Sequence, residues 1–118
     1  MTPTPDHDQP TLDAEFEIHD LRAVHDAQVI AAVRCIGAPV RLGARFRRIR
    51  DCAAPIDLEL TRIRLFRSDL EELLPVHSAL VALRGTGTLL LTPGTPGNGY
   101  QIIRGTNPRP HGTRGPRR

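Results

Sequence analysis

The chain has 118 residues, which is enough for one domain with a working hydrophobic core and too few for several domains. Hydrophobic residues make up 39% of it, so the chain is not disordered throughout, and aromatic residues make up only 3%, so its core must be aliphatic. The formal net charge is +3, and all 16 basic residues are arginines, which we attribute to the coding bias of a GC-rich bacterial genome.

Both ends of the chain lack apolar periodicity. Residues 1–13 are acidic and contain Pro and Thr, whereas residues 106–118 are rich in Gly, Pro and Arg. We expect both to be disordered tails around a single domain at residues 14–105. The first ten residues do not resemble a signal peptide, and no apolar run is long enough to span a membrane, so we expect a cytoplasmic protein.

The first half of the domain is a series of short strands. Apolar and polar residues alternate over 14–19, as in a half-buried strand. A run at 28–36 places every second apolar residue on one face, and Gly and Pro at 37–39 end it. Further strands are expected at 40–42 and 45–50.

The next segment contains a change of register and a break from the strand pattern. Residues 56–65 alternate, but the parity of the apolar positions flips near Thr61, which predicts a β-bulge. Residues 68–73 are the one helix-like stretch, because a Ser opens it, Glu71 completes a capping box and Pro75 follows. We therefore expect one short helical turn at this point.

Strands at 76–84, 88–92 and 100–104 complete the domain, with a Gly- and Pro-rich turn at 93–99. Turn signals at this spacing favour an all-β domain, and we expect a single small β-barrel of about six to eight strands. The alternation predicts a core that includes Phe16, Ile18, Val29, Val33, Val40, Phe46, Leu65, Val81, Leu83 and Ile102.

Four segments in order resemble the second domain of translational GTPases, the β-barrel known from elongation factor Tu. They are an aromatic-containing opening strand at Phe16–Asp20, a Gly-Val-type turn at Gly37–Gly43, an apolar-Phe-basic end at Leu65–Arg67, and an apolar strand closing with Arg-Gly at Leu80–Gly85. The sequence departs from the family at 74–78, where the family usually has Ala-Gly-Asp or Ala-Gly-Glu.

The resemblance implies a barrel and a class of partner. In the family this barrel helps to bind the aminoacyl end of tRNA or the ribosome, so we expect a non-enzymatic binding module whose partner is RNA or a ribosome-associated protein. These 118 residues contain no Gly-x-x-x-x-Gly-Lys phosphate loop and no lysine that could form one, so we expect no GTPase activity from them. No contact residue is carried over from the family.

The candidate nucleic-acid-binding residues form a basic cluster on two expected strands. If those strands pair, their arginines would line one outer face and could bind phosphates. The alternatives are a solvated face with cross-strand ion pairs, and a protein partner instead of RNA. The candidate residues are Arg45, Arg47, Arg48, Arg62 and Arg64.

A second hypothesis, a small metal-binding protein or enzyme, depends on two His-Asp pairs, His19-Asp20 and His25-Asp26. No third or fourth ligand is evident, and a polar strand end explains the same residues, so we expect neither a catalytic site nor a metal or other cofactor. Cys35 falls on an apolar face, which predicts an inert buried thiol, and a Cys35–Cys52 disulfide would need an oxidising compartment.

Overall fold

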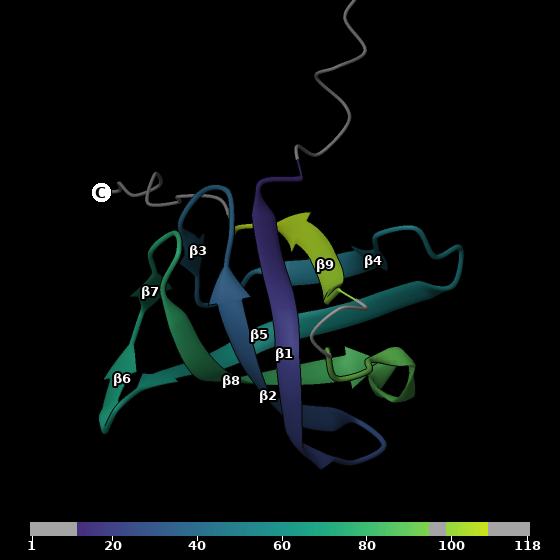
Figure 1. Cartoon of the computed structure of the whole chain (residues 1–118), viewed down its shortest axis with the longest axis horizontal. Coiled ribbons are helices and arrows are strands. Elements are labelled where there is room, and N and C mark those ends of the chain that lie inside the picture. The colour runs from purple at the N-terminus through teal and green to yellow at the C-terminus, as the bar shows by residue number, and fades with distance from the viewer. Residues whose placement is uncertain (1–11, 95–98, 109–118) are drawn as a thin grey trace, which may run out of the picture.

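The computed structural model describes residues 12–94 and 99–108, and shows a closed antiparallel β-barrel (Figure 1). Neighbouring strands follow the order β4-β9-β1-β2-β8-β5, and a further pairing of β5 with β4 closes the ring. The barrel strands are β1 (Ala14–Val24), β2 (Gln28–Cys35), β4 (Arg45–Ile49), β5 (Pro55–Leu65), β8 (Ser78–Thr86) and β9 (Gln101–Thr106). The predicted all-β barrel is therefore confirmed.

Three short strands lie outside the ring. β6 (Ser68–Leu70) pairs with the end of β5, and β3 (Val40–Arg41) pairs with β7 (Glu72–Leu73) in a separate two-stranded sheet. Figure 1 shows β6 and β4 at opposite ends of the long strand β5. The two ends of β5 therefore have different neighbours, β4 at its start and β6 at its end.

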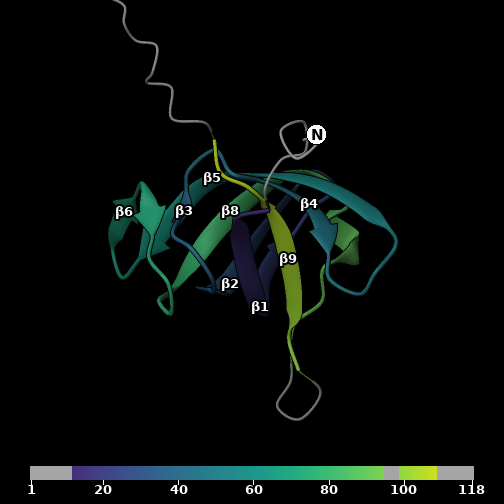
Figure 2. The same cartoon turned by 90° about the horizontal axis from the view of Figure 1, so that it is seen from above.

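Figure 2 shows the strands arranged round an interior when the molecule is seen from above. The buried side chains of the core pack together inside the barrel. The rings of Phe16 and Phe46 stack at its centre with centroids 4.9 Å apart, and aliphatic side chains surround them. Of the ten predicted core residues, all are buried except Leu65, which is partly buried and packs against the core. Leu65 differs because it is the last residue of β5, at the rim of the barrel.

The expected bulge near Thr61 is present. The pairing of β5 with β8 shifts register between Leu60 and Arg62, and the Thr61 hydroxyl donates a hydrogen bond to the Ala82 carbonyl (3.2 Å). Because a bulge bends a strand and increases its twist, it lets β5 curve round the barrel while its apolar side chains on both sides of the bulge stay inside.

The helical turn expected at 68–73 is wrong, because this segment forms β6 and β7. Residues 68–70 fold back on β5 through a two-residue turn, and residues 72–73 pair with Val40–Arg41. A six-residue helix is marginal in isolation, so strand pairing within the fold outweighs the local capping signal.

The strand expected at 88–92 is also wrong, because Thr88–Leu90 form a 3₁₀ turn, η2, and residues 91–92 belong to no strand. The preceding Gly87 has a φ of 93°, which redirects the chain at the end of β8. The buried Thr88 hydroxyl lies within 2.8 Å of the His25 carbonyl oxygen and 3.2 Å of that of Asp26, which ties the turn to the β1–β2 connection.

Asn107 joins the two ends of the domain to the β3 region. Its backbone N–H donates to Asp13 Oδ1 (2.9 Å), its side-chain oxygen accepts from the Arg41 N–H (2.8 Å), and its Nδ2 donates to the Pro39 carbonyl (3.0 Å). The parts of the two expected tails at 1–11 and 109–118 lie outside the described residues. Within the described ranges, no helix is long and apolar enough to cross a membrane.

Candidate functional site

The five candidate arginines all lie on the outer surface of β4 and β5, and these two strands pair as expected. The register, however, sets Arg48 opposite Pro55, at the start of β5, whereas Arg62 and Arg64 lie near its end. Arg64 lies nine positions after Pro55 on β5, which corresponds to about 30 Å along the strand. The arginines therefore form two groups at opposite ends of β5, and the structure does not bring them into one stripe.

Arg45 lies between these groups and is paired with acidic residues. Its Nη2 donates to Asp57 Oδ1 (2.8 Å), its Nε donates to the same oxygen (3.2 Å), and its Nη1 lies 3.7 Å from Glu59 Oε1. All three side chains are a little under half exposed. Two carboxylates beside one guanidinium leave no net positive charge here to attract a phosphate.

Arg62 is held by a neighbouring strand. Its Nε donates to Asp69 Oδ1 (2.9 Å) and its Nη2 to Asp69 Oδ2 (3.3 Å), so the guanidinium and the carboxylate pair through two bonds. These bonds lower the pKa of Asp69 and raise that of Arg62, and the nearby charge of Arg64 lowers the pKa of Asp69 further. Asp69 thus compensates part of the charge at this end of β5.

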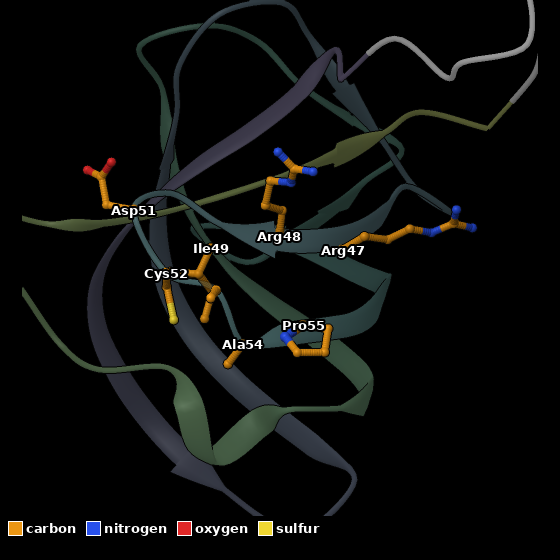
Figure 3. Close-up of a pocket in the computed structure, with 8 residues that line it drawn as sticks. Arg47, Arg48, Ile49, Asp51, Cys52, Ala54 and Pro55 are labelled. Atoms are coloured by element: carbon orange, nitrogen blue, oxygen red, sulfur yellow. The ribbon is translucent and has the colours of Figure 1, made fainter.

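Arg47 and Arg48 differ from Arg45 and Arg62, because both are exposed and neither guanidinium has a carboxylate within 4.0 Å among the residues the structure describes. Arg64 shares this property, but it stands at the other end of β5 beside the Arg62–Asp69 pair. A register shift between Phe46 and Arg48 places the two consecutive side chains on the outside. Such a bulge is the usual way to redirect a side chain at the rim of a barrel. Figure 3 shows the two side chains leaving β4 in different directions, away from Asp51.

An open pocket of about 420 Å³ lies beside these two arginines, between β4 and the loop that leads to β5. Asp51 in this loop has a φ of 63°, a backbone conformation that Asp adopts more readily than most residues. The carboxylate of Asp51 is 3.8 Å from the guanidinium of Arg50. It forms no ion pair with Arg47 or Arg48, so the positive charges of these two arginines are not compensated. The pocket is lined by Arg47, Arg48, Ile49, Asp51, Cys52, Ala53, Ala54 and Pro55.

The two His-Asp pairs of the metal hypothesis are not brought together. His19 lies within β1, where its Nε2 is 2.8 Å from Glu17 Oε1 and its ring stacks on Tyr100 with centroids 4.2 Å apart. His25 and Asp26 lie in the β1–β2 connection. Among the described residues, no group of three or more His, Cys, Asp or Glu side chains could hold a metal ion.

The two cysteines are free and differ in environment. Cys35 is fully buried, its Sγ donates to the Ala38 carbonyl (3.3 Å), and burial raises the pKa of its thiol. Cys52 is exposed in the loop beside Arg47 and Arg48. An inert thiol at Cys35 agrees with its place on the inner face of β2.

One exposed feature was missed in the sequence. Phe66, in the turn between β5 and β6, is 91% exposed and borders a second pocket on the outside of the barrel. The sequence carried no usual signal for this turn, because two-residue hairpins favour Gly, Asn or Asp and the residues here are Phe66 and Arg67. The helical interpretation of 68–73 also concealed the turn.

The comparisons with known proteins support the fold. Translation elongation factor SelB from Methanococcus maripaludis, in its apo form, superposes with a TM-score of 0.60 at 11% identity, over 79% of this chain and 18% of that one. SelB of the same organism in complex with the GTP analogue GppNHp gives a TM-score of 0.60 at 10% identity, over 83% of this chain and 20% of that one. No protein-family model and no curated protein matches the sequence.

The chain thus spans about a fifth of SelB, a translation elongation factor. At 10–11% identity the likeness concerns the fold. The resemblance to the barrel of translational GTPases, drawn from four short segments, is confirmed at that level.

Proposed function

We propose that this barrel is a non-catalytic binding module that contacts RNA through Arg47 and Arg48. The observation that carries the proposal is the pair itself: two adjacent, exposed guanidinium groups without a carboxylate partner in the described part of the chain, at the rim of an open pocket. Two such groups can each bind a phosphate oxygen without first breaking an ion pair.

The fold supports the choice of RNA. A translation elongation factor contains a barrel of this fold. In the family that the sequence resembles, the barrel helps to bind tRNA or the ribosome. Few exposed aromatic side chains accompany the two arginines, so recognition would depend on phosphates and would be largely independent of sequence. The proposal implies a cytoplasmic location.

The test is titration of the full chain with labelled tRNA and with a random single-stranded RNA at several salt concentrations. Binding should be weak and strongly salt-sensitive, because phosphate contacts release counterions. The double variant Arg47→Gln/Arg48→Gln should bind more weakly and should flatten the log–log salt dependence by about 0.7–0.9 for each contact removed.

A charge-matched control separates a local site from general attraction. Arg62→Gln/Arg64→Gln removes the same charge from the opposite end of β5 and should leave binding nearly unchanged. Equal losses in the two double variants would mean that the overall charge attracts RNA without a defined site. Absence of binding at low salt would reject RNA and leave a ribosome-associated protein as the partner to seek.

A further inference from the structure

The turn between β5 and β6 holds a side chain that the fold does not use. Phe66 is 91% exposed, the largest exposed fraction among the large hydrophobic residues described. Its φ is 60°, in the left-handed region that residues with a β-carbon avoid. Glycine or asparagine at this position would relieve that strain. Phe66 therefore lowers the stability of the fold through its exposed apolar ring and through its strained backbone. Such strain is a reason to look for a function.

An apolar pocket adjoins Phe66 on the outer surface of the barrel. Its volume is about 370 Å³, and its apolar lining includes Leu65, Leu80 and Ala32. The sheet register explains this grouping, because Leu80 on β8 lies between Arg64 on β5 and Ala32 on β2. A pocket of this lining fits one large apolar side chain, which would also pack against the Phe66 ring.

Positive charge borders the same pocket. Arg64 lines it and has no carboxylate within 4.0 Å among the described residues, and Arg67 is exposed next to Phe66. Arg22 lines another part of the pocket, with its side chain 60% exposed and its Nε 3.2 Å from Asp20 Oδ2. The nearby Asp69 carboxylate is occupied by Arg62. Arg64 and Arg67 therefore offer an acidic ligand guanidinium groups without a carboxylate partner among the described residues, whereas Arg22 is already paired with Asp20.

We propose that the Phe66 pocket, lined by Leu65, Phe66, Leu80, Ala32, Arg64 and Arg22, docks an acidic segment of a partner protein. The segment inserts one large apolar side chain beside Phe66 and places carboxylates against Arg64 and Arg67. The shallow, largely apolar surface of this pocket fits a Leu or Phe side chain better than a nucleobase, whose polar edges would find few partners there.

This site is independent of the proposed RNA contact. Arg47 and Arg48 lie at the other end of β5, about 30 Å along the strand. A module with one contact at each end of β5 could hold RNA and an acidic protein at the same time. Either contact can fail in experiment without affecting the other.

The experiment is a selection of random peptides displayed on phage against the full chain, with counter-selection against the Phe66→Gly variant. Glycine adopts the positive φ of this position, so the variant keeps its fold, and Phe66→Asn provides a second variant for the same reason. The selected peptides should share a large apolar residue flanked by Asp or Glu. The most enriched peptide is then synthesised, labelled and titrated by fluorescence anisotropy.

Both Phe66 variants should weaken binding of that peptide at least about tenfold, the loss typical of a central apolar anchor. Arg64→Gln should weaken it by a smaller factor and reduce its salt dependence. Leu89→Ala is the matched control, because Leu89 is an exposed apolar residue (75%) outside the pocket, and it should leave binding unchanged.

Four results would overturn the proposal. They are enrichment of no peptide beyond the Phe66→Gly background, selected peptides without acidic residues, equal binding by the wild-type chain and both Phe66 variants, and equal loss of binding in Leu89→Ala. Binding of single-stranded RNA or of phosphatidylserine–phosphatidylcholine vesicles that is lost in Phe66→Gly, without peptide binding, would assign the pocket to that other class of partner.

Discussion

Phe46 and Phe66 lie twenty positions apart in the chain, one inside the barrel and one in an exposed turn. Phe46 is fully buried and stacks on Phe16, whereas Phe66 is 91% exposed and strained in its backbone. The same residue type therefore stabilises the fold at position 46 and destabilises it at position 66. The comparison shows that packing accounts for the residues on the inner face of this barrel. The exposed residues at the two ends of β5 do not contribute to packing, so a binding partner is the reason to seek for them.

The largest expected effect is at Phe46. Replacing it with Ala should destabilise the protein by about 3–5 kcal/mol, because the change removes the stacked ring and leaves a cavity at the centre of the core. Urea unfolding followed by circular dichroism measures the difference. A loss below about 1 kcal/mol would mean that the core relaxes round the missing ring.

Gly105 tests how closely the strands of the barrel approach each other. A β-carbon at this position would lie 1.8 Å from the Arg45 carbonyl oxygen, so Gly105→Ala must force β9 away from β4. We expect a loss of about 2–3 kcal/mol. Gly99→Ala is the control, since nothing lies within 4 Å of that position and only its positive φ resists substitution. Because Gly105 has no positive φ, equal losses would show that a small shift of β9 relieves the close approach at Gly105.

Asn107 tests whether the barrel depends on the segment after β9. Asn107→Ala removes the bonds to the Arg41 N–H and the Pro39 carbonyl and should cost about 1–2 kcal/mol. Hydrogen exchange should show faster exchange of the Arg41 amide.

A shortened chain of residues 11–108 retains the bonds of Asn107 and should melt within a few degrees of the full chain. A large drop in melting temperature would assign a structural role to the removed residues.

Phe66→Gly should change stability in the opposite direction and raise the free energy of unfolding. Relief of the left-handed strain stabilises the folded chain by about 1–2 kcal/mol, and the greater freedom of glycine in the unfolded chain offsets about 0.4–1 kcal/mol of this. We therefore expect a net gain of about 0–1.6 kcal/mol. Denaturant midpoints of the two proteins measure it. A destabilised variant would show that the Phe66 ring packs against its own fold, which would weaken the contrast with Phe46.

The smallest expected effect is at the other end of β5. Arg47→Gln/Arg48→Gln should change the free energy of unfolding by no more than about 0.5 kcal/mol, because neither exposed side chain has an acidic partner among the described residues. Thermal melts of wild type and variant at equal ionic strength are the measurement. A larger loss would show that these arginines stabilise the fold and would remove the reason to assign them to a ligand.

Local patterns in the sequence were sufficient for much of the fold. The alternation of apolar residues identified the strands that supply the core, and the parity flip located the bulge at Thr61, because a period of two ties each residue to one face. The helix expected at 68–73 failed for a related reason. Its capping residues act over one turn, whereas Leu70 pairs with Ile63 across a tight hairpin and Leu73 pairs with Val40 from a distant part of the chain.

The sequence by itself determined that this is a small all-β barrel with exposed arginines on β4 and β5, because composition and alternation act residue by residue. The tertiary structure alone decided which of those arginines are free. Strand register pairs Arg45 with Asp57 and Arg62 with Asp69, while a bulge leaves Arg47 and Arg48 without such a partner in the described residues. Register joins residues that are far apart in the chain, and one shift of the pairing changes every neighbour.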